Sequence, residues 1–297
     1  MSNARLQEIA LLPLDQRAAR IAQLFAEGTG EAPAPRAPEK RKSLPALARG
    51  LAFWAHPRRA PYALVALAAF AGRKNFSAFA PPRALAVADG FCGFAPVPDA
   101  EAALDLYARG LYFDAFPGLA SLWSPHRRAI VRPAEALRLP GGAGDGDGPC
   151  EVRLDRAFER LLDLCESLRT NPGRRPPFPA PLSQLFVHGL AHVLEMRGED
   201  GETRAAIVGV GVGAVFTVEG FFARDRAAFA HAVAALARHL AGLNFLAIDF
   251  HANSPDLHGL PLELISREGF LALLGAPGGS RAGRWRAQAD AAQSRAA

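Results

Sequence analysis

Cysteine is scarce in this sequence, and long apolar runs are absent. The three cysteines, Cys92, Cys150 and Cys165, form no C-x-x-C pair, so neither a disulfide framework nor a thiolate zinc site is indicated. We therefore expect a reducing, cytoplasmic compartment. The longest apolar run, residues 60–72, is well short of the ~20 residues that span a bilayer. Charges interrupt residues 1–25, so we expect a soluble globular protein with no secretory signal and no membrane association.

Motifs for covalent catalysis and for cofactors are missing as well. The chain has no G-x-S-x-G nucleophile elbow, and Cys92 has no local signature, so covalent catalysis is unsupported. Residues 209–213 follow G-x-G-x-G and run into strand-forming residues, whereas a dinucleotide fingerprint is G-x-G-x-x-G opening a helix. Such glycines indicate close approach of the backbone in a strand. We expect no cofactor.

One pair of histidines has the spacing of a zinc site. His188 and His192 would present two imidazoles on one helix face, with His251 and His258 as the further ligands that zinc needs. Gly189 stands inside that helix, where glycine is unfavourable by ~1 kcal/mol relative to alanine. A helix that ends at Gly189, with His192 on a following strand, explains the segment better. We expect no metal.

The chain carries a mild excess of basic charge. Lys and Arg number 34 against 29 Asp and Glu, giving a net charge of +5 and a pI near 9.5. This balance suits an acidic partner such as RNA, and it suits a solvated, arginine-rich surface equally well. With 297 residues, half of them hydrophobic, the chain can bury a sizeable core, and its length favours two domains over one.

Composition divides the chain into segments. Residues 4–27 have helical apolar spacing and lead into a Pro- and charge-rich stretch that cannot pack a core. Residues 139–150 concentrate glycine and aspartate, which predicts a loop at a domain boundary. The expected units are a helix with a linker over 1–43, a small amino-terminal domain over 44–148, a second domain over 149–275 and a mobile tail over 276–297.

The second half of the chain predicts a mixed α/β domain. Residues 150–154 are expected to form a strand, followed by a helix with Asp155 as its N-cap and Cys165 in the core. Residues 205–222 are rich in valine and phenylalanine and predict two strands that turn near Gly211 or Gly213. A helix over 224–243 then leads directly into the next strand. Strands and helices in this order favour an α/β (α+β) fold with a mixed central sheet.

Asp249 and His251 end an apolar strand over residues 245–250. Because side chains alternate along a strand, the two residues share one face at its carboxyl end, where α/β sheets usually bind ligands. Alternatively, both residues begin a solvent-facing loop. Glu219 also follows a hydrophobic strand, where it either opens a turn or projects a carboxylate into an apolar pocket.

Seven segments together resemble, in order, the leucyl/phenylalanyl-tRNA–protein transferases. They are residues 107–113, 122–131, 154–165, 188–195, 209–222, 247–257 and 265–274. The resemblance covers about residues 79–274, and the residues before it are similar to an added extension. It implies a small amino-terminal domain followed by an acyltransferase domain of the GNAT-like fold. It also implies an enzyme that moves leucine or phenylalanine from aminoacyl-tRNA onto a protein whose first residue is arginine or lysine.

The resemblance also implies roles for particular residues. Asp249 and His251 fall on the aspartate and glutamine of the family's I-D-C-Q, and Glu219, Phe221 and Phe222 fall within its E-S-M-F segment. We expect Asp249 to orient the attacking amine and help remove its proton, Glu219 to bind the basic first residue, and the two phenylalanines to line the transferred side chain. His251 could accept a proton. The other substrate contacts implied are Tyr112, Trp123, His192 and Glu195.

Phosphates of the tRNA would be met by basic side chains. The candidates are Arg58, Arg59, Arg73, Lys74, Arg127 and Arg128. The enzyme is expected to act as a monomer on its RNA and protein substrates.

Several residues depart from the family pattern. The family's G-I-F-P-W becomes residues 110–114 and ends in aspartate, only Trp123 remains of the paired tryptophans, and His251 and Phe221 replace glutamine and methionine. Two alternatives therefore stay open. One is a GNAT-like acyltransferase that uses a different aminoacyl-tRNA or acceptor, and the other is a non-catalytic descendant that binds tRNA or peptide.

Overall fold

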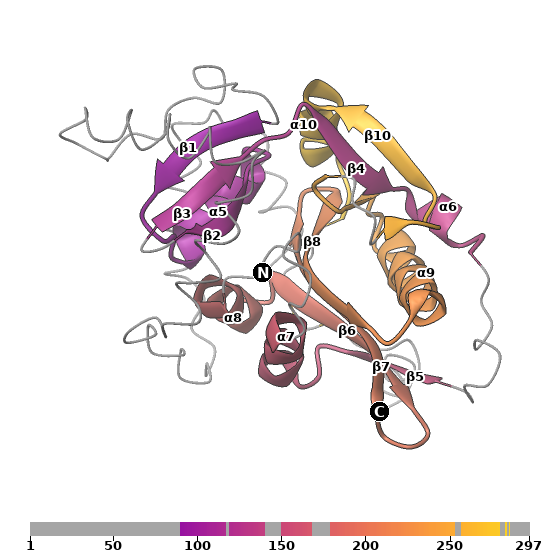
Figure 1. The fold of residues 1–297 in the computed structure, drawn as a ribbon. Helices are drawn as coiled ribbons and strands as arrows, with labels where there is room; N and C mark the ends of the chain where they lie inside the picture. Colours follow the sequence, from indigo (N-terminus) through magenta and orange to yellow (C-terminus); the bar gives the residue numbers. More distant parts are fainter. Residues whose placement is uncertain are drawn as a thin grey trace.

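The computed structural model describes residues 90–116, 119–139, 150–167, 179–252, 257–279, 283 and 285. These residues form two β-sheets (Figure 1). The smaller sheet has three antiparallel strands in the order β1-β3-β2. Its strands are β1 (Phe91–Ala95), β2 (Tyr112–Phe116) and β3 (Leu119–Trp123), and its helix is α5 (Ala100–Ala108).

The larger sheet has seven strands in the order β10-β4-β9-β8-β7-β6-β5. Its strands are β4 (Arg127–Val131), β5 (Cys150–Leu154), β6 (Ala191–Gly198), β7 (Thr203–Val212), β8 (Val215–Ala223), β9 (Ala247–Asp249) and β10 (Leu262–Ser266). All neighbouring strands are antiparallel except β8 and β9, which are parallel. A mixed sheet with helices confirms the predicted α/β (α+β) class.

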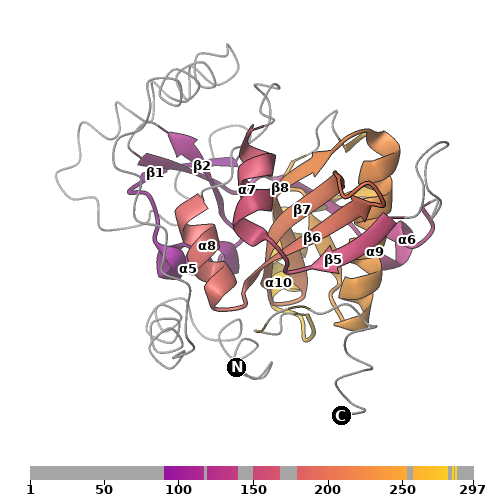
Figure 2. The ribbon, with the colours of Figure 1, turned by 90° about the horizontal axis from the view of Figure 1, so that it is seen from below.

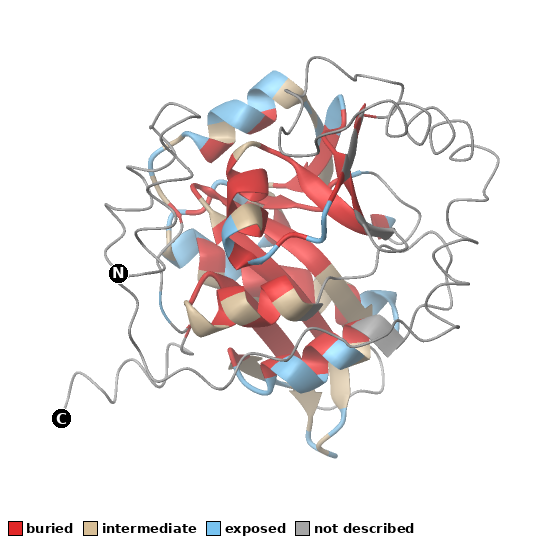
Figure 3. Ribbon diagram, turned by 90° about the vertical axis from the view of Figure 1, so that its left-hand side faces the viewer, coloured by how far each residue is buried: buried red, intermediate tan, exposed pale blue. Residues whose placement is uncertain are grey.

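Helices cover both faces of the large sheet. The helices are α6 (Pro133–Ala136), α7 (Phe158–Ser167), α8 (Pro179–Val187), α9 (Arg226–Gly242) and α10 (Arg267–Leu274). Helix α9 lies on one face, and α7 and α8 lie on the other with the small sheet (Figures 1 and 2). Figure 3 shows that most of the sheet is buried between these layers. The fold therefore places the two sheets against each other on the face opposite α9.

Two large apolar clusters hold these layers. On the α9 face, Phe229 and Val233 pack with Phe216 and Ile248 of the sheet. On the other face a single cluster joins residues of α5 and the small sheet to those of α7, α8, β6 and β7, and it includes Cys165, as predicted. Strand β4 precedes residue 148 but pairs with β9 and β10, so the large sheet takes strands from both sides of the boundary predicted there.

The predicted turn between β7 and β8 lies at Gly213. Its φ is +56°, and a Cβ at this position would lie 2.1 Å from the carbonyl oxygen of Leu274, so only glycine fits without strain. Gly209, within β7, lies against the backbone of Thr217, which agrees with close backbone approach in a strand. The chain also turns at Gly189, at φ +67° after α8, and His192 lies on β6, as the sequence favoured over a zinc-binding helix.

Two expectations differ from the structure. Asp155 does not cap α7, because it lies at φ +51°, three residues before the helix begins. Trp285, in the segment predicted as a mobile tail, is only 6% exposed and packs in the cluster on the α9 face. The predictions for residues 1–89 and for the loop over 140–149 lie outside the described residues.

Candidate functional site

A cluster of buried polar side chains lies where the small sheet meets the large one. Its members are Arg128 of β4, Glu219 of β8, Asp249 of β9 and His251 just after β9, each no more than 4% exposed. Tyr112 of β2 closes the cluster, with its ring 4.3 Å from the His251 ring. Because these residues are buried, the alternative that Asp249 and His251 begin a solvent-facing loop is wrong.

Asp249 is held by three donors. Its Oδ1 accepts from the backbone N–H of His251 at 2.8 Å. Its Oδ2 accepts from Thr217 Oγ1 at 3.4 Å and lies 3.4 Å from Arg128 Nη1. Thr217 is the register partner of Asp249 in the parallel pair β8–β9, so both side chains project from the face opposite α9. Charged and neutral donors together fix the carboxylate in one orientation.

His251 is engaged at both ring nitrogens. Nδ1 lies 3.0 Å from Arg128 Nη1, and Nε2 lies 2.9 Å from the carbonyl oxygen of Val218 and 3.4 Å from Glu219 Oε1. The backbone of His251 has φ +66°, which is uncommon for a residue with a side chain. This conformation ends the strand and brings the imidazole and the Asp249 carboxylate together at the sheet interface.

Glu219 lies at a β-bulge and faces this cluster. Val208 of β7 pairs with Gly220, but the next residue, Gly209, pairs with Val218, so Glu219 is the extra residue on β8. Val218 packs on the α9 face, so regular alternation places Glu219 on the opposite face, where its Oε1 lies 3.4 Å from His251 Nε2. The bulge changes the alternation after Glu219, and Phe221 therefore returns to the α9 face. The carboxyl groups of Asp249 and Glu219 thus both lie beside the His251 ring, an arrangement that suits the approach of a cationic group.

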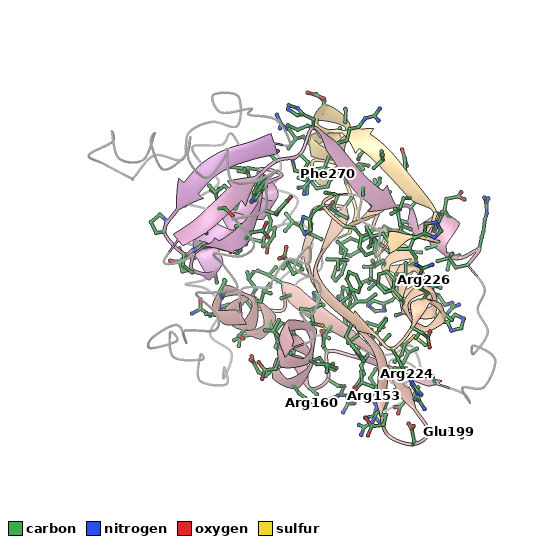
Figure 4. The ribbon with its side chains drawn as sticks, in the orientation of Figure 1. Arg153, Arg160, Glu199, Arg224, Arg226 and Phe270 are labelled. Atoms are coloured by element: carbon green, nitrogen blue, oxygen red, sulfur yellow. The ribbon has the colours of Figure 1, made fainter. Side chains whose placement is uncertain are left out.

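Arg128 is the residue whose role the sequence missed. The sequence predicts a phosphate contact, but Arg128 is only 2% exposed and its guanidinium donates from Nη2 to the carbonyl oxygen of Gly110 at 2.9 Å. The Phe270 ring of α10, labelled in Figure 4, lies 4.1 Å from the guanidinium carbon. This arginine lies in the segment over residues 122–131 that carries part of the family resemblance, but nothing in that segment indicated its partner on β9.

The predicted aromatic contacts divide between the two faces. Trp123 stacks at 6.5 Å on Tyr112, beside the cluster, and donates from Nε1 to Ser121. Phe221 stacks at 4.3 Å on Phe229 of α9, so it lies on the face opposite Asp249. Phe222 packs against the cluster formed by α7 and α8.

His192 and Glu195 belong to other networks. His192 Nδ1 lies 2.9 Å from Asp155 Oδ2, and its ring stacks at 3.9 Å on Trp285. The Trp285 backbone N–H donates to the same Asp155 oxygen at 2.5 Å. Glu195 accepts from Arg160 of α7, which is labelled in Figure 4, at 2.5 Å and from Thr203 at 2.6 Å. The structure thus gives both residues partners other than Asp249, His251 and Glu219.

His239 of α9 lies beside this second network. Its ring is 4.6 Å from Trp285, and its Nε2 is buried with no hydrogen-bond partner among the described residues. Burial lowers the pKa of His239 to about 4, with a further contribution from the neighbouring His192, while Asp155 opposes the shift. The His239 imidazole is therefore neutral at physiological pH.

The predicted phosphate contacts fall mostly outside the described residues. Arg58, Arg59, Arg73 and Lys74 lie in that part of the chain, whereas Arg127 is exposed at the start of β4. Acidic side chains outnumber basic ones within the described ranges. The basic excess of the whole chain therefore comes from the remaining segments, above all residues 1–89.

Two general expectations can be compared with the described part of the chain. It contains no group of three or more His, Cys, Asp or Glu side chains that could hold a metal ion. None of the helices described there has the length and apolar character needed to cross a bilayer.

Comparison with known proteins identifies the family. The model of the leucyl/phenylalanyl-tRNA protein transferase family matches residues 146–275. The leucyl/phenylalanyl-tRNA–protein transferase of Chromohalobacter salexigens is 31% identical over 56% of this chain and 66% of its own length, and that of Thiobacillus denitrificans is 30% identical over 59% and 78%. The structure of L-PGS from Bacillus licheniformis aligns with 53% of this chain and 51% of its own, at a TM-score of 0.30 and 10% identity, a likeness too weak to indicate function. The chain belongs to the leucyl/phenylalanyl-tRNA–protein transferase family.

Proposed function

We propose that this protein transfers leucine or phenylalanine from aminoacyl-tRNA to the amino terminus of a protein that begins with arginine or lysine, thereby marking that protein for degradation. The observation that carries the proposal is the buried cluster of Asp249, His251, Glu219 and Arg128, found in a chain of this transferase family. Its two carboxyl groups and its position between the sheets support binding of an amine beside an acyl group.

The reaction is aminolysis of an ester. The amine nitrogen attacks the carbonyl carbon of the aminoacyl group, the bond to the ribose oxygen of the tRNA breaks, and one proton leaves the amine for the departing oxygen or solvent. Alignment of the two reactants can supply ~7–11 kcal/mol, whereas a general base gives ~10²–10⁴-fold. An α-amine has a pKa of ~7.7–8.0, so roughly a tenth is already neutral at pH 7. Positioning therefore dominates.

Asp249 and Glu219 have separate roles in this proposal. Asp249 Oδ1 accepts one bond from the protein, so it retains a lone pair for the attacking amine. Glu219, at the bulge, faces the cationic first residue of the acceptor, and Tyr112 and Trp123 form the apolar wall beside the acyl group.

The direct test mixes purified protein with leucyl- or phenylalanyl-tRNA and a peptide that begins with arginine. Mass spectrometry should find one added residue on the peptide, and a matched peptide beginning with glutamate should gain nothing. No mass gain with any charged tRNA would exclude the transferase function.

We also propose that the protein acts as a monomer in the cytoplasm. Its three cysteines are all free, which supports a reducing compartment.

A second candidate differs in the amino acid that is transferred. Asp114 stands where the resemblance implies tryptophan, and it shares a face of β2 with Tyr112. A buried carboxyl group beside the proposed apolar wall favours a donor with a polar or basic side chain. A screen of all charged tRNAs with the same arginine peptide separates the two candidates.

Contact with tRNA phosphates would come from exposed Arg127 and from basic residues outside the described ranges. Binding to tRNA should then weaken as salt rises, since each neutralised phosphate releases counterions. An affinity that does not change between ~50 and ~200 mM salt would exclude phosphate contacts of this kind.

A further inference from the structure

Arg128 fixes the geometry of the cluster from both sheets at once. Its Nη2 donates to Gly110 O in the small-sheet half, while Nη1 lies 3.0 Å from His251 Nδ1 and 3.4 Å from Asp249 Oδ2. The guanidinium carbon also lies 4.1 Å from the Phe270 ring and 5.3 Å from the Tyr112 ring. With contacts in its plane and over its faces, the guanidinium has one orientation.

This orientation determines where the proton of His251 resides. A guanidinium has only donors, so the His251 nitrogen that faces Arg128 Nη1, namely Nδ1, must accept. The imidazole is therefore neutral with its hydrogen on Nε2, from which it donates to Val218 O at 2.9 Å. Both ring nitrogens are used by the protein itself.

The surrounding charges could favour a protonated ring instead. The groups that face His251 are Glu219 at 3.4 Å from Nε2, Asp249 at 3.6 Å from Nδ1, Arg128, and the ring of Tyr112. A proton on Nδ1 would place two N–H groups against each other at 3.0 Å. Relieving that clash would require Arg128 to leave Gly110 and Asp249, and a buried guanidinium without partners is costly. The neutral ring satisfies the contacts at both of its nitrogens.

We propose that Arg128 is a positioning residue that holds His251 in this single tautomer, so that His251 supplies a fixed acceptor and a fixed donor and takes no proton during the reaction. The kinetic consequences of this assignment rest on the proposed function, whereas the tautomer itself does not. The assignment replaces the expectation from the sequence that His251 accepts a proton. A glutamine side chain offers the same pair, with its oxygen toward Arg128 and its N–H toward Val218. Histidine at this position therefore preserves the hydrogen bonds that glutamine would make.

The tautomer can be measured without any activity. The ¹⁵N NMR spectrum of histidine-labelled protein at pH 7 should show His251 as a neutral ring with its proton on Nε2, assigned by the signals that disappear in His251→Gln. In Arg128→Met, two carboxyl groups remain beside the ring with no guanidinium, so the ring should become protonated on both nitrogens. A wild-type ring that carries a proton on Nδ1, or a spectrum unchanged by Arg128→Met, would overturn the proposal.

Kinetics then separate positioning from folding. Arg128→Lys replaces the planar fork by a single point charge and should lower kcat by ~10²-fold, with KM changed by less than about threefold. His251→Ala should lower kcat by at least about tenfold, and His251→Gln, which restores an acceptor and a donor at the same place, should recover most of that loss. Arg132→Lys is the matched control, because Arg132 is a half-exposed arginine paired with Glu263 outside the cluster.

Each kinetic outcome is decisive. The proposal is wrong if His251→Gln is as inactive as His251→Ala, or if Arg128→Lys raises KM and leaves kcat unchanged. If the wild-type protein shows the Nε2–H ring but transfers no amino acid to any peptide, the proposed function fails while the assignment of Arg128 and His251 stands.

Discussion

Replacing His239 should remove much of the acid sensitivity of this protein. His239 lies partly buried beside Trp285, its Nε2 is buried with no hydrogen-bond partner among the described residues, and burial lowers its pKa to about 4 from a usual value of 6.5. The folded protein therefore resists protonating this ring at a pH where the unfolded chain already binds the proton. Stability is fully present above pH 6.5 and is lost as the pH falls from 6.5 toward 4.

The magnitude follows from the two pKa values. The full shift, from 6.5 to about 4, corresponds to roughly 3 to 4 kcal/mol, at about 1.4 kcal/mol per pKa unit. Between pH 7.5 and pH 5.0, where only part of the window is crossed, His239 should cost about 2 kcal/mol of the free energy of unfolding. Burial also lowers the pKa of His188, so His188 also lowers the free energy of unfolding as the pH falls. His188 is present in the wild type and in every His239 variant, so its contribution cancels when the two are compared.

The assay is urea denaturation at pH 7.5 and pH 5.0 for wild type, His239→Gln and His239→Asn. Both variants should lose about 2 kcal/mol less than wild type between the two pH values. The two replacements differ in length but neither titrates, so they should agree with each other if the effect is one of charge. Equal losses for all three proteins would refute the assignment of acid sensitivity to His239.

Three further predictions concern other parts of the molecule. Asp249→Asn should lower turnover in the peptide assay by more than ~10-fold and leave the affinity for tRNA unchanged, because it removes a carboxylate of the site and no phosphate contact. Filter binding measures that affinity, and a fall in affinity would contradict the prediction. Trp285→Ala should destabilise the fold by about 3–5 kcal/mol, since it removes a buried ring that stacks on His192, and a change below about 1 kcal/mol in urea would show that the ring is not part of the core. Gly213→Ala should lower the melting temperature, because its Cβ would lie 2.1 Å from Leu274 O, whereas Gly242→Ala, with open space around its Cβ, should leave it unchanged or raise it.

Local elements of the second half were predictable from the sequence. The strand over Cys150–Leu154, the hairpin that turns at Gly213 and the helix Arg226–Gly242 all match the predicted pattern closely. These elements depend on hydrophobic periodicity and on a glycine at positive φ, which are properties of residues near one another in the chain.

The partners within the site were not predictable in the same way. Arg128 and Asp249 meet because β4 pairs with β9, and an apolar strand pattern does not say which strand lies beside it. The bulge at Glu219 depends on the register of β7 against β8, which single residues do not reveal. Trp285 is one indole in a stretch without periodicity, so nothing in the sequence indicated that it packs against His192.

The order of strands in the large sheet has a consequence for how the enzyme is made. Strand β4 at Arg127–Val131 lies between β9 at Ala247–Asp249 and β10 at Leu262–Ser266. The residues on and after β9 that contact Arg128 are therefore synthesised more than a hundred residues after it. Such distant pairings form slowly, because a long loop must close before any contact is gained. On the ribosome, at ~5–20 residues per second, several seconds separate the synthesis of β4 from that of β9. The cluster of Arg128, Asp249 and His251 therefore cannot assemble on the nascent chain until β9 has been synthesised.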